Sequence, residues 1–493
     1  MGFIAIDLGT TNIKVAAFDD ELNSLGMVSE NVTYQRQDDF VEFDAEQYFD
    51  LVIACIRRCC QASFPAPPYP VRQIVLTGQA ESLVTLDEDN RPVRPAISWL
   101  DMRSKEECEE LKHQFPVSVC YRTTGQPEII PTWPVTKIFW LRRHEPQNYA
   151  RIARYLLLKD YIQFRLTGRF AGEYSIYNFS HYFNITRKDF WPEILDYCGI
   201  SRHQLPGLVE PCSILGPVLD DLTGELGLAA GVEVNVGTLD HFAGMVGTGN
   251  ICAGLISEST GTVLSIATLV NKPDFSQSNL PLHYGPFKDT YVYLPVCESG
   301  GISLEWFKKS FLPDLSYAQI NTEAGKRTIP NDLIFLPYIT GVNAPDFNPD
   351  ASGVFFGIQS RHDPIDFAIA IMEGVAHLLK RNMDFIEKAG FKTEKIISTG
   401  GGARSEIWSQ LKADLTRHSV AIPQNEEAAC LGAAMIGAVS AGIFSSYEEA
   451  ACRCVAIKKV YNPQPADKLA AKHALFNQLY EQMLPVYRQA ARN

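Results

Sequence analysis

The sequence predicts an α/β protein built from two domains, and three observations lead to that prediction. The chain has 493 residues, a length that suits two domains better than one. Apolar, β-prone runs alternate with helical patterns through the N-terminal third, which is typical of an α/β fold. A strand–turn–strand pattern occurs once in each half of the chain, which indicates that one unit has been duplicated.

The composition argues against several classes of protein. The formal net charge is −13, whereas binding to nucleic acid or to anionic lipid needs a basic surface. No run approaches 18 apolar residues and residues 1–6 show no signal peptide, so we expect neither a membrane span nor secretion. The twelve cysteines are scattered without a CxxC pair, as expected of reduced thiols in the cytoplasm.

The first element is a strand that leads into a polar turn, in the stretch FIAIDLGTTNIKVAAFD at residues 3–19. Asp7 ends the first apolar run, residues 9–12 form the turn, and Lys14 lies in the second run. Backbone N–H groups and hydroxyls in such a turn can bind phosphate oxygens, and an acid beside them can hold Mg²⁺. The alternative is a plain β-hairpin whose Asp and Gly only shape the turn.

The next elements are helical patterns over residues 44–60 and 105–113, with a strand over residues 73–76 between them. This alternation supports the α/β assignment, because parallel strands need helical connections.

Three acids follow apolar runs at predicted strand ends: Glu81, Asp101 and Asp240, with Arg103 close behind Asp101. Ligand sites in α/β sheets gather at the carboxyl ends of strands, so these acids together indicate a site. Each acid alone could instead be solvated or cap a helix, as Asp240 would if a helix began at His241.

The chain changes character at residues 232–268, which are rich in Gly and Thr, and we place the domain boundary near residues 245–255. In this part Ser259, Gly261 and Thr262 repeat the spacing of the first turn, with serine in place of the acid. The second half therefore predicts a second copy of the strand–turn–strand unit.

Three features complete the second half. The glycine triplet at residues 400–402 follows an apolar run and precedes a helical pattern from about Ser405, which lets a ligand approach the backbone closely. Residues 425–439 form a helix of small residues that could pack beneath a nucleotide or could be only core. A final amphipathic helix is predicted over residues 466–492.

Two longer stretches match the signatures of a known family. ASGVFFGIQSRHDPIDFAIAIMEG at residues 351–374 matches one signature throughout. TWPVTKIFWLRRH matches the other at positions that include Pro134, Lys137 and Trp140, while Thr132 departs from its first position. With the turns and acids above, the sequence resembles the FGGY family of carbohydrate kinases from residue 3 to about residue 445.

The resemblance implies a fold and an activity. The fold is α/β, with two actin-like, ribonuclease-H-like domains that arose by duplication and flank a catalytic cleft. Residues 1–247 would bind the sugar and supply the first phosphate turn, residues 248–455 would bind the nucleotide, and residues 456–493 would form a helical tail. The implied reaction is phosphorylation of a sugar or polyol hydroxyl with ATP and Mg²⁺, and the resemblance leaves room for a homodimer.

The resemblance also implies the site residues. Asp240 falls on the catalytic base, and Asp7 on the magnesium-associated acid. Nucleotide contacts fall on Gly9, Thr10, Thr11, Asn12, Lys14, Thr262, Gly301, Glu305, Gly401 and Ser405. Substrate contacts fall on Gln79, Glu81, Asp101, Arg103, Asp240 and His241.

The substrate is less well defined by these motifs. Members that phosphorylate glycerol carry Arg–Glu where this chain has Ala80–Glu81, and Tyr where it has Thr132, which argues against glycerol. Members specific for xylulose carry Met–His where this chain has Ala80–Glu81. We expect a ketopentose, in a pocket that residues 172–184 help to line unless they are only surface. The alternatives are another sugar, a polyol, a sugar acid such as gluconate, or an actin-like ATPase switch without a sugar pocket.

Overall fold

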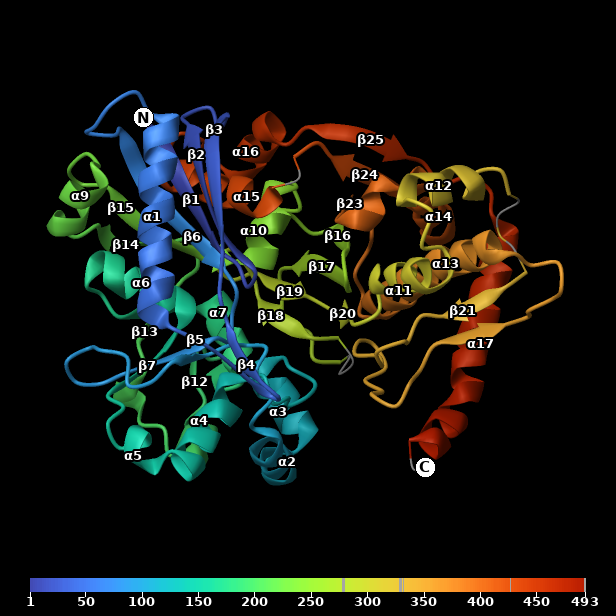
Figure 1. The fold of residues 1–493 in the computed structure, drawn as a ribbon, viewed down its shortest axis with the longest axis horizontal. Coiled ribbons are helices and arrows are strands. Elements are labelled where there is room, and N and C mark those ends of the chain that lie inside the picture. The colour runs from blue at the N-terminus through green and yellow to red at the C-terminus, as the bar shows by residue number, and fades with distance from the viewer. Residues whose placement is uncertain (277–279, 328–329, 331, 426, 492–493) are drawn as a thin grey trace.

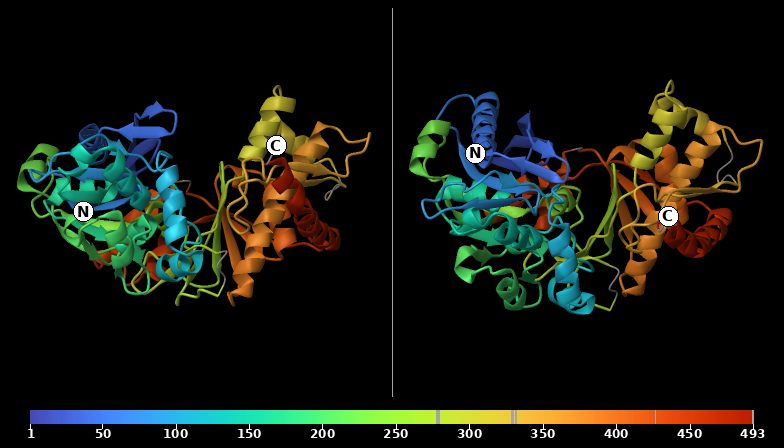
Figure 2. Two further views of the ribbon diagram at one scale, coloured as in Figure 1. Left: turned by 90° about the horizontal axis from the view of Figure 1, so that it is seen from below. Right: turned by 60° about the horizontal axis from the view of Figure 1, so that its bottom comes forward.

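The computed structural model describes residues 1–491 apart from residues 277–279, 328–329, 331 and 426. The chain forms two lobes, each built around its own β-sheet, with helices α10 (Asp240–Gly247) and α15 (Ala428–Ser440) between the sheets (Figures 1 and 2). None of the described helices is both long enough and apolar enough to cross a bilayer.

The first sheet has the strand order β14–β15–β6–β1–β2–β3. Strand β1 pairs antiparallel with β2 and parallel with β6, and β6 pairs parallel with β15. The aliphatic side chains of β1 alternate between the two faces of the sheet. Ile4 and Ile6 pack beneath α1 and α6, whereas Phe3 and Ala5 pack against α15. The bounds are β1 Gly2–Leu8, β2 Asn12–Asp19, β3 Ser24–Asn31, β6 Val71–Gly78, β14 Ile214–Pro217, β15 Glu233–Leu239, α1 Ala45–Ser63 and α6 Leu158–Thr167.

The second sheet has the order β18–β19–β17–β16–β23–β24–β25 and repeats the topology of the first. Strand β16 pairs antiparallel with β17 and parallel with β23, as β1 does with β2 and β6. The repeat supports the predicted duplication of the strand–turn–strand unit. The bounds are β16 Leu255–Thr260, β17 Leu264–Val270, β18 Leu282–Tyr284, β19 Tyr291–Tyr293, β20 Val296–Cys297, β23 Lys395–Thr399, β24 Ser419–Pro423 and β25 Ile457–Tyr461.

The strand register matches the two units residue by residue. Asp7 lies opposite Lys14 on one side and Thr77 on the other. In the second unit Ser259 occupies the corresponding place, opposite Ser265 and Thr399. The acid of the first turn therefore has a serine as its counterpart, as the sequence comparison of the two turns predicts.

The remaining elements extend the lobes. A five-stranded sheet of the first lobe has the order β4–β5–β8–β7–β9, and small two-stranded sheets pair β10 with β13, β11 with β12, and β21 with β22. In the first lobe the bounds are β4 Gln35–Gln37, β5 Phe40–Phe43, β7 Leu83–Leu86, β8 Ala96–Ile97, α2 Lys105–Gln114, α3 Val117–Thr124, α4 Pro134–His144, α5 Pro146–Tyr149, β9 Arg154–Leu157, β10 Ala171–Glu173, α7 Tyr174–Tyr177, η1 Asn178–Ser180, β11 Phe183–Asn184, β12 Asp189–Phe190, α8 Pro192–Cys198, η2 Arg202–Gln204, β13 Gly207–Val209 and α9 Asp220–Leu226. In the second lobe they are α11 Ile302–Phe311, α12 Tyr317–Ala324, β21 Ile334–Leu336, β22 Val354–Phe356, α13 Pro364–Lys388, η3 Gly401–Arg404, α14 Glu406–Thr416, α16 Tyr447–Cys454 and α17 Asp467–Ala490.

The elements expected from periodicity are confirmed at close to their expected bounds. The pattern at residues 44–60 is α1, which Asp44 caps by accepting hydrogen bonds from two N–H groups of the first turn. The pattern from about Ser405 is α14, with Ser405 as its cap, and the tail is α17. Arg492, the expected end of the tail, lies outside the described residues.

The helix of small residues, α15, is part of the core of the first lobe. It packs on β1 and β6 and crosses α10 (Figure 1). A Cβ added to Gly432 would lie 1.8 Å from the backbone oxygen of Ala243, and one added to Gly247 would lie 1.9 Å from that of Ala428. The core interpretation of residues 425–439 therefore holds, and glycine is required at this backbone contact.

The close crossing predicts that two glycine substitutions differ sharply in their effect on the free energy of unfolding. Gly432→Ala should lower the free energy of unfolding by about 1–3 kcal/mol, because the new methyl group forces two helix backbones apart. Gly244→Ala on α10 is the matched control, since a Cβ there meets nothing within 4 Å and alanine favours a helix. Thermal or denaturant unfolding measures the stability of both variants. Equal stability of the two would contradict a close backbone contact between α10 and α15.

Candidate active site

Three carboxylates meet at the carboxyl ends of neighbouring strands. Asp7 lies in β1, Glu81 follows β6 and Asp240 follows β15, and these three strands run parallel side by side. Burial raises the pKa of Asp7 and of Glu81, and the charge of Asp240 raises each further, so Asp240 lies within electrostatic reach of both. The sequence prediction grouped Glu81, Asp101 and Asp240 at strand ends. In the structure Asp7 accompanies Glu81 and Asp240, whereas Asp101 lies in a buried ion pair with Arg103.

The Asp7 carboxylate is strongly desolvated. Burial, followed by the charge of Asp240, raises the pKa of Asp7 from 3.8 to about 7, while Lys14 acts in the opposite direction. Its Oδ1 atom is buried without a hydrogen-bond partner among the described residues. A buried carboxylate oxygen without a partner is costly, and a cation is the natural compensation.

The first polar turn is supported from several sides. Gly9 is required there, because a Cβ would lie 2.4 Å from the backbone oxygen of Asn12. The Trp99 Nε1–H donates to Thr10 Oγ1 at 2.7 Å, and the Tyr48 hydroxyl donates to the carbonyl of Gly9 at 3.1 Å. The turn, which includes the exposed Thr11, is thus held in place while its outer surface stays open.

Lys14, on the strand that follows this turn, reaches across to the second half of the chain. Its Nζ forms an ion pair with Glu427 at 2.5 Å, just before α15. Sequence reasoning included Lys14 but missed Glu427 and Trp99. The sequence did contain a signal for Trp99, because its indole offers an N–H donor two residues before the predicted site residue Asp101.

The second turn brings together residues that are far apart in the sequence and that were predicted to contact the nucleotide. The N–H of Gly301 donates to the carbonyl of Gly261 at 2.7 Å, and the N–H of Gly300 donates to that of Thr262 at 3.1 Å. Gly400 packs on the same turn, since a Cβ there would lie 2.8 Å from the backbone oxygen of Thr260. Thr262, Gly301 and the glycine triplet around Gly401 therefore form one backbone-lined surface.

Ser405 and Glu305 lie on the helices around this surface. The Ser405 hydroxyl donates to Asn321 Oδ1 at 2.6 Å, which ties the start of α14 to α12. Glu305 is exposed on the first turn of α11, near Tyr317, whose pKa is raised by burial and then by the charge of Glu305. Ser405 thus directly follows the turn of the glycine triplet, and Glu305 lies on the helix that follows Gly301.

Asp240 opens α10, and its Oδ1 accepts a hydrogen bond from the N–H of His241 at 2.6 Å. Burial raises the pKa of Asp240, while His241 and Lys159 act in the opposite direction. Lys159 is itself buried, and it donates to Glu173 at 2.8 Å and to the carbonyl of Val236 at 2.9 Å. Sequence reasoning missed this lysine, which supports the strand leading to Asp240.

A cavity of about 250 Å³ joins the two duplicated units at this point. Asp240 and His241 line it from the first unit, and Ser259, Ser265 and Thr399 line it from the second. The candidate base therefore faces strands β16, β17 and β23 of the second sheet.

Gln79 and Glu81 lie on the first-lobe side. Gln79 is held at both ends of its amide, donating to the carbonyl of Gly9 at 3.3 Å and accepting from Ser82 Oγ at 2.7 Å. Glu81 has the unusual backbone angle φ of 69°, and its Oε2 is buried without a partner among the described residues. Glu81 therefore has the free acceptor capacity of a ligand-binding side chain, which Gln79 lacks.

Asp101 and Arg103 form a buried ion pair whose other contacts are with residues of the first lobe. Their side chains are 0% exposed, and Arg103 Nη2 lies 2.7 Å from Asp101 Oδ2. Asp101 also accepts from the N–H of Val41 at 2.6 Å, and Arg103 lies over the ring of Phe40 at 4.2 Å. These contacts account for the residues structurally, and their predicted contact with substrate stays a prediction.

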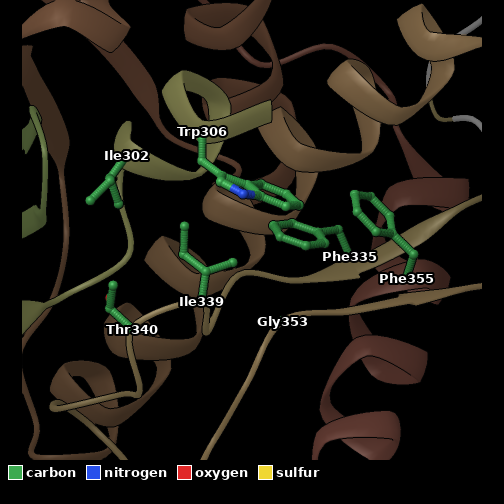
Figure 3. Close-up of a pocket in the computed structure, with 7 residues that line it drawn as sticks. All are labelled: Ile302, Trp306, Phe335, Ile339, Thr340, Gly353 and Phe355. Carbon is green, nitrogen blue, oxygen red and sulfur yellow. The ribbon is translucent and has the colours of Figure 1, made fainter. Parts of the chain in front are cut away.

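A second hollow, of about 470 Å³, lies between α11 and the β21–β22 hairpin. Figure 3 shows the Trp306 indole beside the rings of Phe335 and Phe355, with Ile302, Ile339 and Thr340 around the opening. The lining contains no acid or base, so this hollow is unsuited to phosphoryl transfer.

Comparison with known proteins agrees with this geometry. The descriptions of the N-terminal and C-terminal domains of the FGGY family of carbohydrate kinases match residues 3–247 and 270–441. The chain belongs to this family. The FGGY kinase is 30% identical to a xylulose kinase of Staphylococcus epidermidis over 99% of this chain and 96% of that protein. It is 26% identical to a gluconokinase of Bacillus subtilis over 90% of this chain and 88% of that protein.

A solved structure shows the same fold for the whole chain. The ligand-bound xylulose kinase from Lactobacillus acidophilus has a TM-score of 0.93 with the FGGY kinase at 24% identity, covering 99% of both chains. The two-lobed, actin-like fold and carbohydrate kinase activity expected from the sequence are thus confirmed.

The buried charge of Asp7 predicts a pH-dependent gain in stability when the charge is removed. The folded-state pKa of about 7 lies above the ordinary 3.8, so wild-type stability falls as the pH rises between these values. Asp7→Asn should therefore raise the free energy of unfolding more at pH 8 than at pH 5, by about 2–3 kcal/mol. Unfolding of the metal-free protein at both pH values measures this difference. The exposed Asp50→Asn is the control, and a pH-independent effect of Asp7→Asn would contradict the account.

Proposed function

We propose that this carbohydrate kinase transfers the γ-phosphoryl group of ATP to a hydroxyl of a ketopentose, with D-xylulose as the first candidate. The observation that carries the proposal is the cavity shared by both lobes, in which Asp240 faces Ser259, Ser265 and Thr399 of the second unit. The full-length similarity to xylulose kinases supports the choice of sugar.

Asp240 acts as the general base in this proposal. The sugar hydroxyl is a weak nucleophile, and its proton must leave as the oxygen bonds to phosphorus and the bond to ADP breaks. Burial raises the pKa of Asp240, which makes its carboxylate a stronger base than an exposed aspartate. Its hydrogen bond to the N–H of His241 keeps one oxygen oriented and leaves the other for the hydroxyl.

Both backbone turns hold the phosphates of ATP. The first turn offers its N–H groups and hydroxyls from one side, and the surface of Thr262 and Gly301 closes the other side. The adenine side of the nucleotide would meet Glu305, Gly401 and Ser405 on the second lobe. Closure of the lobes would exclude water, which otherwise competes with the sugar for the phosphoryl group.

The Asp7 carboxylate is suited to bind a magnesium ion that the phosphates of ATP also bind. Its unpartnered buried oxygen needs a cation, and among the described residues no three His, Cys, Asp or Glu side chains form a metal-binding group. Mg²⁺ commonly binds through one or two carboxylates together with substrate phosphates, and there it neutralises their charge. Asp7 would thus hold the ion on the first lobe.

The sugar binds on the side of Glu81 and His241. Glu81 offers an acceptor without a partner, and the small Ala80 beside it leaves room for a chain longer than glycerol. Three acids around the site disfavour an anionic sugar acid, so a neutral sugar is the better fit than gluconate. We place the enzyme in the cytoplasm, as all twelve cysteines are unpaired.

A coupled assay of ADP release tests the substrate. D-xylulose should give the highest kcat/KM in a panel of ketoses, glycerol and gluconate, by about ten-fold or more over the last two. Gluconate as the best substrate would overturn the choice of sugar. An absence of sugar-dependent ADP release across the whole panel would overturn the proposed function itself.

The substitution Asp240→Asn tests the base. Asparagine keeps the size and the acceptor for the N–H of His241, but it cannot take a proton. We expect kcat to fall by about 10²–10⁴-fold while binding of sugar and ATP changes little. If Asp240 only begins α10, asparagine should serve equally well, and near-normal turnover of the folded variant would establish that role.

A further inference from the structure

A buried ion pair lies behind the second turn and the glycine triplet, and the mechanism above does not use it. Lys412 on α14 and Glu258 on β16 form this pair at 2.8 Å, and both side chains are 0% exposed. Moving two charges out of water is costly, and a buried ion pair is often no more stabilising than apolar residues of similar volume. Net stability is therefore a poor explanation for these two charges.

Two hydroxyl groups complete the hydrogen bonding of the pair. The Lys412 Nζ also donates to Thr260 Oγ1 at 2.8 Å, and the Thr260 hydroxyl donates in turn to the Glu258 carboxylate. The Ser398 hydroxyl donates to the other oxygen of the same carboxylate. The network thus joins β16, β23 and α14, and it satisfies both carboxylate oxygens, so it favours a single arrangement of these three elements.

The same residues lie where both turns begin. Thr260 is the last residue of β16 and leads directly into Gly261, while Ser398 lies one residue before the end of β23, which leads into Gly400. The glycine triplet also packs on Thr260. A Cβ on Gly400 would lie 2.8 Å from the Thr260 backbone oxygen, and one on Gly402 would lie 2.7 Å from the Thr260 Cβ. A shift of Thr260 would therefore move both turns.

We propose that Lys412 is a positioning residue of the nucleotide site, which holds the turn at Gly261 and the glycine triplet in the arrangement that binds the nucleotide. The proposal rests on the proposed function, because it takes these two turns as nucleotide-binding. Lys412 is fully buried, so it acts through Glu258 and Thr260. Without the ammonium group, the Glu258 carboxylate would be a buried charge without its counterion, and movement of the end of β16 toward water would relieve it.

The test compares wild type with Lys412→Met, which removes the charge but keeps much of the side-chain volume. Calorimetric titration with Mg²⁺-ADP should give a Kd about ten-fold or more above that of wild type. The ATP KM should rise likewise, whereas the sugar KM should stay within about two-fold of wild type, because the sugar is proposed to bind on the first lobe. A purely structural role would lower the Tm without this split between the two substrates.

A double variant separates the arrangement of the turns from a loss of positive charge near the phosphates. Adding Glu258→Gln to Lys412→Met removes the unpaired carboxylate, and the amide oxygen still accepts from the Thr260 hydroxyl. The Kd for Mg²⁺-ADP should return to within about three-fold of wild type. An ADP Kd as high as in Lys412→Met alone would overturn the proposal.

The matched control is Lys472→Met, which removes another buried lysine of the second lobe, paired with Glu373 between α17 and α13. It should lower the Tm and leave the ADP Kd unchanged. If Lys412→Met fails to fold, Lys412→Gln keeps a donor for Thr260, removes the charge and should raise the ADP Kd in the same way. An unchanged ADP Kd in the folded Lys412 variant, or an equal rise in Lys472→Met, would overturn the proposal. Wild-type protein that binds ADP without sugar-dependent turnover would overturn the proposed function alone, because the ADP Kd still decides the role of Lys412.

Discussion

The active site depends on one backbone contact, the crossing of α10 and α15 at Gly247 and Gly432. Each glycine lies against a carbonyl of the other helix, where a Cβ would come within 2 Å of an oxygen. Helix α10 begins with Asp240, and α15 follows Glu427, the partner of Lys14. The crossing thus fixes the place of the candidate base relative to the first turn, and the Lys14–Glu427 pair beside it joins segments near the two ends of the chain.

Around this crossing the protein holds several buried carboxylates that oppose folding. Burial raises the pKa of Asp7, Glu81 and Asp240, and two of them keep an oxygen without a partner among the described residues. Such groups are costly unless a ligand or cation completes them. The charge of buried Lys137 lowers the pKa of Glu81 and that of buried Lys159 lowers the pKa of Asp240, which offsets part of this cost. The site is therefore prepared for ligands that bring positive charge and hydroxyl groups.

Much of this arrangement could be predicted from sequence, because strand ends and turns are local features. The meeting of Glu81 and Asp240 follows from acids placed after apolar runs, since parallel strands bring their carboxyl ends together, but Asp101, predicted with them, lies in a separate buried ion pair. Contacts between distant segments could not be predicted in this way. The burial of Arg103 against Asp101 and the lobe to which α15 belongs depend on tertiary packing, which periodicity does not report.

The central claim is that Asp240 takes a proton from a sugar held between the two lobes. A crystal structure of the protein with D-xylulose and ADP tests it most directly. The account predicts a sugar hydroxyl oxygen within about 2.6–3.2 Å of an Asp240 carboxylate oxygen, on the side facing the turn at Thr262, with Glu81 bound to another hydroxyl. A sugar bound away from Asp240, with that carboxylate engaged only by the N–H of His241, would contradict the account.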